Sequence, residues 1–368
     1  MIIGVLKEPS PETRISLTPE TVSALKKKGY SILVETNAGN NAFCSNEHYI
    51  ASGAEIADRS RVLSSADILL SINSPSDLEA IPQGKILVGT FSPLNHPDIN
   101  LKMASGKMTV FSLDMLPRTT RAQTMDVLSS QANIAGYKAV LLAANVFPRY
   151  FPMLMTAAGS IPPAKVLILG AGVAGLQAIA TSRRLGAVVE VFDTRQAVKE
   201  EVMSLGAKFV EVEGAADASS AGGYAVEQTE EYKQKQQARI AEAVKKADIV
   251  ITTAQIPGKK APLLITEAML QTMKEGSVII DIAASTGGNT PFTRNNETIT
   301  KYGVTIVGNS NLPASMPYDA SKLYAKNVAN FLALVTSKEG AINLNFDDDL
   351  VKGSCIVHGG EVVHNRLK

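Results

Sequence analysis

The feature that most constrains the fold of this chain is a glycine-rich turn directly after a short apolar run. Residues 165–169 read KVLIL and residues 170–175 read GAGVAG. The apolar run has the length and composition of a buried strand, and the residues after the turn have helical spacing. A strand, a tight turn and a helix in this order predict a βαβ unit, and therefore a mainly parallel sheet.

The three glycines of this turn have separate physical roles in a nucleotide-binding fold. Gly170 permits the tight turn, Gly172 lets the backbone approach a pyrophosphate, and Gly175 lets the helix pack closely on the strand. The helix N-terminus then presents unpaired N–H groups to the phosphates. We therefore predict a dinucleotide site in this loop. Its residues are Gly170, Ala171, Gly172, Val173, Ala174 and Gly175.

An acid after the next strand pattern indicates which dinucleotide binds. The run VVEVFD ends at Asp193, and Thr194 and Arg195 follow it. A carboxylate at this position accepts hydrogen bonds from the adenosine ribose and repels a 2′-phosphate, which favours NAD(H). The alternative is that Arg195 binds the 2′-phosphate of NADP(H).

Short strand patterns alternate with helical patterns along the whole chain, which is typical of the α/β class. A length of 368 residues exceeds what one hydrophobic core normally organises. We therefore predict two Rossmann-like domains with doubly wound, mainly parallel sheets, joined by long helices. The first domain is discontinuous and comprises residues 1–128 and 316–368, and the second, which binds NAD(H), comprises residues 129–315.

Individual elements can be placed from periodicity and from helix-capping signals. Thr18 precedes Pro19 and a helical pattern that ends at Gly29. A long helix is expected from about residue 121 to residue 147, before Pro148, and a mobile surface loop at about residues 214–236, where Ala, Gly, Ser and charged residues accumulate. The stretch GSCIVHGGEVVH near the end resembles a hairpin. Strands of the first sheet are expected in MIIGVL, SILVET, ADILLSI, KILVGTF and MTVFSLD, and those of the second in KVLIL, VVEVFD, KFVEV, DIVITTA, SVIIDIA and VTIVGN.

Composition excludes several classes of partner. The chain has 36 Lys and Arg residues against 35 Asp and Glu, a formal net charge of +1. It therefore lacks the excess of positive charge that binding to nucleic acid or to an anionic membrane would favour. No apolar run reaches the ~18 residues of a membrane span, and the N-terminus lacks a signal-peptide pattern. Cys44 and Cys355 lie far apart, which indicates neither a disulfide framework nor a zinc site. We expect a cytoplasmic protein without a metal or a direct membrane span.

Longer motifs carry a family resemblance over nearly the whole chain. The sequence resembles the alanine dehydrogenase and transhydrogenase superfamily. The motifs are KEPSPETRISLTPE, ADILLSINSP, IPPAKVLILGAGVAGLQA, DIVITTAQIPGKKAPLLIT and GSVIIDIAASTGGN.

The acid–base residues of the amino-acid dehydrogenases do not carry over to this chain. The family's substrate lysine falls on Asn73, its catalytic histidine on Pro93, and its acid on Ser285 and Thr286. Arg14 remains, although a structural ion pair or a surface charge explains it better. His96 lies three residues beyond the histidine position, and we expect an exposed loop residue there. Hydride exchange between two nicotinamides needs no such acid–base groups.

The segment PRTTRAQTMDVLSSQANIAGYKAV resembles the transhydrogenase segment that holds the nicotinamide end of NAD(H). The resemblance implies that Arg118, Gln123 and Asp126 position the nicotinamide, and that Ser129 and Tyr137 also contact the cofactor. Catalysis would then rest on positioning, without an acid or base. From spacing alone, a polar linker helix would be the better interpretation.

Two further loops match the transhydrogenase pattern. Gly222, Gly223 and Tyr224 fall where the family has a loop that closes over NAD(H), although composition alone fits a disordered connector equally well. Gln255 falls in the loop that lines the family's adenosine pocket.

The resemblance implies the NAD(H)-binding subunit of a proton-translocating transhydrogenase, which passes hydride from NADH to NADP⁺ on a partner domain. The implied partners are an NADP(H)-binding domain and a membrane-spanning proton-channel subunit. The chain would then be a homodimer at the cytoplasmic face of the bacterial inner membrane. The alternatives are an alanine dehydrogenase-like oxidoreductase and a non-enzymatic NAD-binding regulator.

Overall fold

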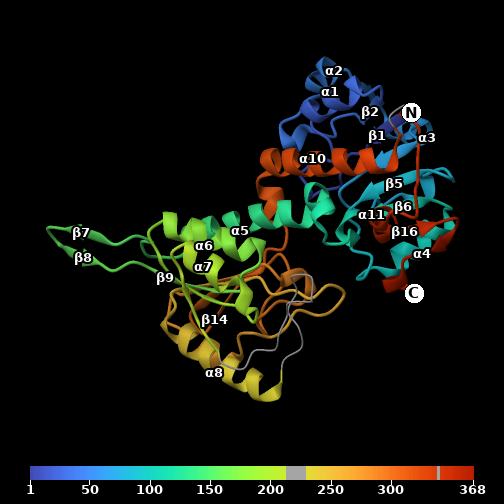
Figure 1. The fold of residues 1–368 in the computed structure, drawn as a ribbon. Helices are drawn as coiled ribbons and strands as arrows, with labels where there is room; N and C mark the ends of the chain where they lie inside the picture. The colour runs from blue at the N-terminus through green and yellow to red at the C-terminus, as the bar shows by residue number, and fades with distance from the viewer. Residues whose placement is uncertain (213–228, 338–339) are drawn as a thin grey trace. The chain divides into compact units, whose positions relative to one another are not determined.

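The computed structural model describes residues 1–212, 229–337 and 340–368. The chain divides into two compact units (Figure 1). Unit 1 comprises Met1–Gln131 and Ala314–Lys368, and unit 2 comprises Ala132–Pro313. The predicted boundaries, after residues 128 and 315, lie close to these divisions.

Unit 1 is built on one mixed sheet with helices around it. Its strands are β1 (Ile2–Val5), β2 (Ser31–Glu35), β3 (Glu55–Ala57), β4 (Ile68–Leu70), β5 (Ile86–Gly89), β6 (Thr109–Ser112), β16 (Cys355–His358) and β17 (Glu361–Val362). Its helices are α1 (Pro19–Lys27), α2 (Asn46–Ala51), α3 (Arg59–Ser65), α4 (Pro97–Ser105), α10 (Pro317–Val335) and α11 (Asp349–Ser354). The sheet order is β17-β16-β6-β5-β4-β1-β2-β3. The strands from β6 to β3 are parallel, and β16 and β17 are antiparallel to their neighbours.

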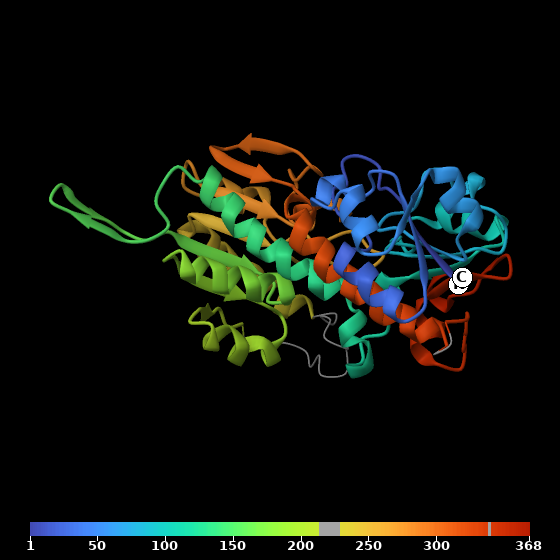
Figure 2. The ribbon, with the colours of Figure 1, turned by 90° about the horizontal axis from the view of Figure 1, so that it is seen from above.

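Unit 2 carries a second parallel sheet. Its strands are β9 (Lys165–Leu169), β10 (Val188–Phe192), β11 (Lys208–Phe209), β12 (Ile249–Thr252), β13 (Val278–Asp281), β14 (Thr298–Lys301) and β15 (Val304–Val307). A separate antiparallel hairpin consists of β7 (Leu154–Thr156) and β8 (Gly159–Ile161). The helices are α5 (Val127–Val146), which starts in unit 1, α6 (Val173–Arg184), α7 (Lys199–Ser204), α8 (Glu230–Lys246) and α9 (Glu267–Gln271). The order is β11-β10-β9-β12-β13-β15-β14, with β14 as an antiparallel edge strand beside β15 (Figure 2).

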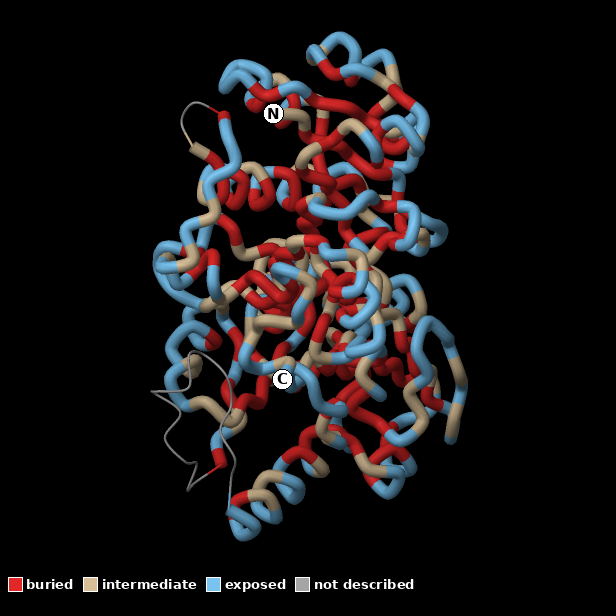
Figure 3. The backbone as a smooth tube through the Cα atoms, turned by 90° about the vertical axis from the view of Figure 1, so that its right-hand side faces the viewer, coloured by how far each residue is buried: buried red, intermediate tan, exposed pale blue. Residues whose placement is uncertain are grey.

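Both sheets are doubly wound, which confirms the predicted fold class. In β4, Ile68 and Leu70 belong to one core cluster and Leu69 to another, because alternate side chains point to opposite faces. In β9, Val166 and Ile168 face one core, and Leu167 faces the other. These strands are buried on both sides. Figure 3 colours the buried residues of the chain red.

Three local predictions need correction. The expected helix from residue 121 starts only at Val127, because residues 120–125 form a 3₁₀ turn and Asp126 interrupts the helix. The predicted loop at 214–236 extends too far, since α8 begins at Glu230 after Thr229, whose Oγ1 accepts a hydrogen bond from the Tyr232 N–H at 3.2 Å. Residues 214–228 of that prediction lie outside the described residues. Thr18 is the N-cap of α1, but its hydroxyl contacts the Thr21 hydroxyl rather than a backbone N–H.

Strands β3 and β14 and the β7–β8 hairpin were not predicted, whereas the hairpin of β16 and β17 was. Cys44 and Cys355 are both buried free thiols. In the part of the chain that the structure describes, no helix is both long and apolar enough to cross a membrane.

Candidate functional site

The glycine-rich loop lies at the carboxyl end of β9, between Leu169 and the start of α6. Gly170 has a φ of +107°, a left-handed conformation that favours glycine. Its N–H donates to the Phe192 carbonyl of the neighbouring strand at 2.8 Å. The Leu176 N–H donates to the Gly172 carbonyl at 2.8 Å and starts the helical pattern of α6. The N–H groups of the first turn of α6 therefore face the loop.

The other two glycines of the loop differ in what surrounds them. A Cβ on Gly175 would lie 1.9 Å from the Gly170 carbonyl oxygen, so the close approach of α6 to β9 requires glycine there. A Cβ on Gly172 would meet no heavy atom within 4 Å. Open space therefore lies beside Gly172 at the N-terminus of α6, where the helix dipole favours an anion. The loop fits the pyrophosphate of a dinucleotide.

Asp193 is fixed against this loop. It follows β10, is buried, and its Oδ2 accepts a hydrogen bond from the Ala171 N–H at 2.7 Å. Arg195 forms an ion pair with the same carboxylate, with Nη2 and Oδ2 2.8 Å apart, and Thr194 between them is half-buried. The sequence predicted each of these residues for the site but not the bond between Ala171 and Asp193.

Thr253, which follows β12, also belongs to the loop's surroundings, and the sequence analysis missed it. Its hydroxyl donates to the Gly170 carbonyl at 3.1 Å and to the Leu169 carbonyl at 3.3 Å. Gln255, two residues further, is exposed, and its Nε2 donates to the Ile282 carbonyl at 3.3 Å. A Ser or Thr directly after a buried strand was the available signal for Thr253.

A buried acid holds the next loop, after β13. Asp281 accepts hydrogen bonds from the Asn289 N–H and the Thr293 hydroxyl, both at 2.6 Å, and from the Ala283 N–H at 3.0 Å. Asn289 in turn donates to the Ala254 carbonyl at 2.9 Å, which ties this loop to the one after β12. No sequence motif indicated a role for Asp281 or Asn289.

Tyr137 lies on α5 near the start of α6. A Cβ on its neighbour Gly136 would lie 2.0 Å from the Ala174 carbonyl oxygen, so the backbones of α5 and α6 are in contact at this point. The Tyr137 side chain is exposed, as is Val173 at the first position of α6. The structure therefore places Gly136, the residue before Tyr137, against the first turn of α6.

The segment predicted to hold the nicotinamide lies in unit 1 around the 3₁₀ helix η4 (Thr120–Met125). Arg118 and Gln123 are exposed. The Thr124 carbonyl accepts hydrogen bonds from Asn327 at 2.8 Å and Asn330 at 3.0 Å, which anchor the segment on α10.

Asp126 and Ser129 form a local cap at the start of α5. The Ser129 N–H donates to Asp126 Oδ1 at 2.9 Å, and the Ser129 hydroxyl donates to Oδ2 at 2.6 Å. Asp126 thus has a structural role that its motif did not indicate, because its carboxylate satisfies an N–H of the first turn.

Gly223 and Tyr224, which were predicted to cover the cofactor, lie outside the described residues.

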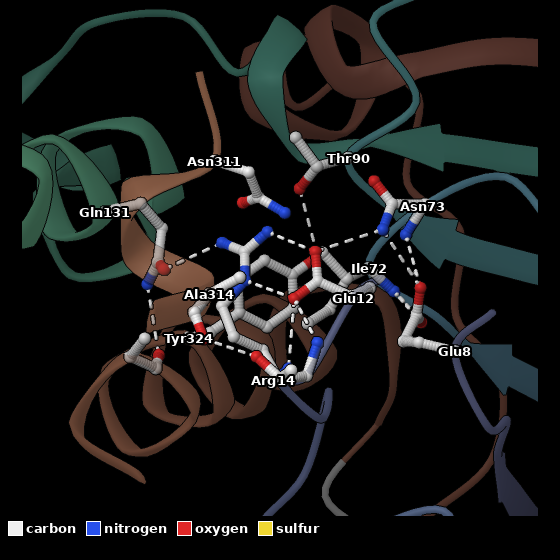
Figure 4. A network of polar contacts seen from close by, with 12 residues as sticks. Glu8, Glu12, Arg14, Ile72, Asn73, Thr90, Gln131, Asn311, Ala314 and Tyr324 are labelled. Atoms are coloured by element: carbon white, nitrogen blue, oxygen red, sulfur yellow. Dashed lines mark hydrogen bonds and ion pairs between the residues drawn. The ribbon is translucent and has the colours of Figure 1, made fainter. Parts of the chain in front are cut away.

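A polar network occupies the carboxyl edge of the unit 1 sheet (Figure 4), with Glu8 and Glu12 buried and Asn73 exposed. Arg14 and Glu12 form an ion pair at 2.7 Å with side chains only 10% and 4% exposed, so Arg14 is a structural ion-pair residue. Asn73 Nδ2 donates to Glu8 at 3.1 Å and to Glu12 at 3.3 Å. Glu8 also accepts from the Ile72 N–H at 2.6 Å.

The two acids of this network have opposite pKa shifts. Burial raises the pKa of Glu8 to about 7, against its hydrogen bonds from Ile72 and Asn73. Burial also acts to raise the pKa of Glu12, but the hydrogen bonds and charge of Arg14 outweigh it and lower the pKa to about 2. Asn73 therefore lies between an ionised acid and one that titrates near neutral pH.

The remaining dehydrogenase positions carry no acid or base in the structure. The Pro93 carbonyl accepts a hydrogen bond from Asn100 at 2.8 Å, and Ser285 is exposed. His96 is exposed and immediately precedes α4, as expected for a loop residue.

The sheet order of unit 2, the glycine-rich loop and the buried acid after its second strand together define a dinucleotide-binding α/β protein. Family models agree along the chain. Residues 4–135 match the N-terminal domain of alanine dehydrogenase/PNT, and residues 139–365 match its C-terminal domain. The chain belongs to the alanine dehydrogenase/PNT family.

Individual relatives separate the two branches of this family. The chain is 44% identical to the polypeptide named as the first part of NAD(P) transhydrogenase subunit alpha in Rhodospirillum rubrum, over 100% of this chain and 99% of the relative. It is 28% identical to alanine dehydrogenase of Bacillus subtilis, over 100% and 94% of the two chains. The crystal structure of transhydrogenase from Sinorhizobium meliloti superposes with a TM-score of 0.90 at 42% identity, over 99% and 100% of the two chains.

Proposed function

We propose that this chain is the NAD(H)-binding subunit of a proton-translocating transhydrogenase, which passes hydride from NADH to NADP⁺ held on a partner domain. The observation that carries the proposal is the open space at Gly172 between the N-terminus of α6 and the loop to which Asp193 is bonded. The 44% identity to a transhydrogenase subunit over the whole chain supports the choice of reaction.

NAD(H), when bound, supplies the hydride; the chain's residues hold and orient it. The loop from Gly170 to Gly175 would bind the pyrophosphate through backbone N–H groups. Asp193 would accept hydrogen bonds from the adenosine ribose hydroxyls, with Thr194, Arg195 and Gln255 around the adenosine, and its charge would disfavour NADP(H).

The nicotinamide end is assigned by family resemblance. Arg118, Gln123 and Asp126 would orient the ring, and Ser129 and Tyr137 would contact the cofactor. Gly223 and Tyr224 would cover it. These residues would act through hydrogen bonds and charge, with no proton transferred.

The amino-acid dehydrogenase alternative lacks its chemical groups. An amide at Asn73, a ring at Pro93 and a hydroxyl at Ser285 replace a lysine, a histidine and an acid. The Asn73 amide is also engaged with Glu8 and Glu12. Keto-acid binding and proton transfer would need groups that these positions do not supply.

The partners follow from the same proposal. An NADP(H)-binding domain and a membrane-spanning proton-channel subunit would complete the enzyme, and would place this chain at the cytoplasmic face of the inner membrane. We also propose a homodimer. The β7–β8 hairpin projects from unit 2 (Figures 1 and 2), with Met155 in β7 74% exposed and Met153, just before β7, 61% exposed. A second copy would cover this apolar surface and the open strand edges.

One set of assays tests the reaction. The purified chain is expected to bind NADH more tightly than NADPH, and to transfer hydride from NADH to an NADP⁺ analogue only when an NADP-binding transhydrogenase domain is added. It is expected to oxidise no alanine. Unaided turnover of pyruvate and ammonia, or a preference for NADPH, would contradict the proposal.

A further inference from the structure

We infer that Arg195 is a masked 2′-phosphate-binding residue, which Asp193 holds in an ion pair and thereby keeps from NADP(H). The inference rests on the proposed function only in taking the end of β10 as the adenosine ribose site. It concerns the ligand class of dinucleotides that carry a 2′-phosphate.

Arg195 and Asp193 form a bidentate ion pair. Arg195 donates from Nε to Asp193 Oδ1 at 2.9 Å and from Nη2 to Oδ2 at 2.8 Å. The Arg195 backbone N–H adds a bond to Oδ1 at 2.8 Å, and the Ala171 N–H adds one to Oδ2 at 2.7 Å. The side chains are only 18% and 6% exposed. Two parallel charge-assisted bonds of this kind fix a guanidinium in both position and direction.

The same bidentate arrangement would suit a phosphate equally well, because guanidinium binds carboxylate and phosphate oxygens with the same geometry. The hydrogen bonds to Asp193 outweigh the partial burial of Arg195 and raise the pKa of its guanidinium, so the side chain stays charged in either arrangement. The charge of Glu201 also acts to raise this pKa, after the hydrogen bonds and the charge of Asp193.

Asp193 then selects against NADP(H) twice. Its charge repels a 2′-phosphate, and its oxygens occupy the one arginine that stands two residues beyond the ribose acid. Removing the charge while keeping the side-chain shape would therefore do more than relieve repulsion. It would also remove the paired bonds of the Arg195 guanidinium to Asp193, at the position where dinucleotide folds that accept NADP carry an arginine.

The test is a set of variants titrated with NADH and with NADPH. Asp193→Asn removes the charge but keeps an oxygen that can accept from the Ala171 N–H. It is expected to bind NADPH about tenfold more tightly than the parent, or better, as one charge-assisted contact is gained. Asp193→Asn combined with Arg195→Gln is expected to keep only the part of the gain that comes from relieved repulsion, and therefore to bind NADPH more weakly than Asp193→Asn. Asp193→Asn combined with Arg294→Gln is the matched control, since Arg294 is an exposed arginine of the same unit, and it is expected to keep the gain.

The outcomes separate this inference from the proposed function. If the parent binds NADH but Asp193→Asn gains no NADPH affinity, or if Arg195→Gln leaves that gain undiminished, the inference is overturned and the proposed function stands. If the parent binds neither dinucleotide, the proposed function is wrong, and the inference about Arg195 is wrong with it. Circular dichroism checks that the variants are folded, and Asp193→Ser, judged by the same criteria, replaces Asp193→Asn should that variant not fold.

Discussion

Asn73 donates a hydrogen bond from its side-chain Nδ2 to the buried carboxylate of Glu8 at 3.1 Å, and its backbone N–H donates to the same oxygen, also at 3.1 Å. A neutral amide thus stands where the dehydrogenases of this family are expected to have a lysine. An amide gives Glu8 hydrogen bonds but no positive charge. Burial of the acid outweighs these hydrogen bonds, and its pKa rises to about 7.

This pKa makes the stability of the fold depend on pH in a defined direction. The folded-state pKa of Glu8 is raised above the ordinary value of 4.5, so the folded chain holds a proton that the unfolded chain has lost between these values. The stabilisation is complete below about pH 4.5 and is lost as the pH rises through about 7. Between pH 5 and pH 8 the loss amounts to about 2–3 kcal/mol.

Glu8→Gln is expected to remove this dependence, because the amide does not titrate. Urea unfolding of parent and variant at pH 5 and pH 8 measures it, and the free energy of unfolding of the parent should fall more over this interval. Glu79→Gln, at an exposed glutamate, is the control and should follow the parent. Parallel curves for the parent and Glu8→Gln would show that Glu8 is ionised throughout.

The glycine-rich loop offers a matched pair of substitutions. Gly175→Ala places a methyl group 1.9 Å from the Gly170 carbonyl oxygen, so α6 must move and the protein should lose roughly 2 kcal/mol or more of stability. Gly172→Ala meets nothing within 4 Å and should leave the melting temperature nearly unchanged. It should still weaken NADH binding, about tenfold or more, because the methyl group occupies the space of the pyrophosphate. Thermal melts and NADH titrations distinguish the two variants. If Gly172→Ala binds NADH as tightly as the parent does, then the pyrophosphate does not bind in this loop.

The exposed hairpin gives a test of the oligomeric state. Met155→Asp puts a charge on a side chain that is 74% exposed in the isolated chain, so it should not harm the fold. It should weaken the homodimer, since a buried, unpaired charge at an interface is costly. Analytical ultracentrifugation of parent and variant over a range of concentrations measures this, with Met203→Asp as the control at another exposed methionine. A parent that sediments as a monomer would contradict the proposed dimer.

Local sequence signals were sufficient for the parallel sheets. The unit β9–α6–β10 is encoded by an apolar run, three spaced glycines and a second apolar run, all within one continuous stretch. Elements with weaker local signals were missed. The β7–β8 hairpin buries little apolar surface, so no alternation of polar and apolar residues marks it. Thr229 followed by two glutamates was an N-cap signal, but the polar composition of its surroundings favoured a loop.

The site was less predictable than the fold for a physical reason. Ala171 and Asp193 are each recognisable from their motifs, but the hydrogen bond between them depends on the pairing of β9 with β10. Glu8 and Asn73 are far apart in sequence and meet only because β1 pairs with β4. Contacts of this kind are set by sheet register, which a single sequence does not specify.

The last prediction concerns the residues assigned to the nicotinamide. Hydride exchange requires two rings to be held at roughly 3–3.5 Å in alignment, so a loss of positioning costs rate more than affinity. Arg118→Ala, Gln123→Ala and Asp126→Ala should therefore slow hydride transfer to the partner's NADP⁺ analogue about ten- to hundredfold. The dissociation constant for NADH should change much less, because the contacts at Gly172 and Asp193 are untouched.

Asp126 needs its own control because its carboxylate also caps α5 through Ser129. Loss of such a cap costs about 1 kcal/mol of stability. Asp126→Asn keeps an oxygen for the Ser129 N–H but removes the charge, so the fold should be retained. If the charge orients the cofactor, Asp126→Asn should transfer hydride as slowly as Asp126→Ala. If Asp126→Asn transfers hydride like the parent while Asp126→Ala is slow and less stable, then the residue acts as a helix cap alone, and Arg118 and Gln123 carry the positioning.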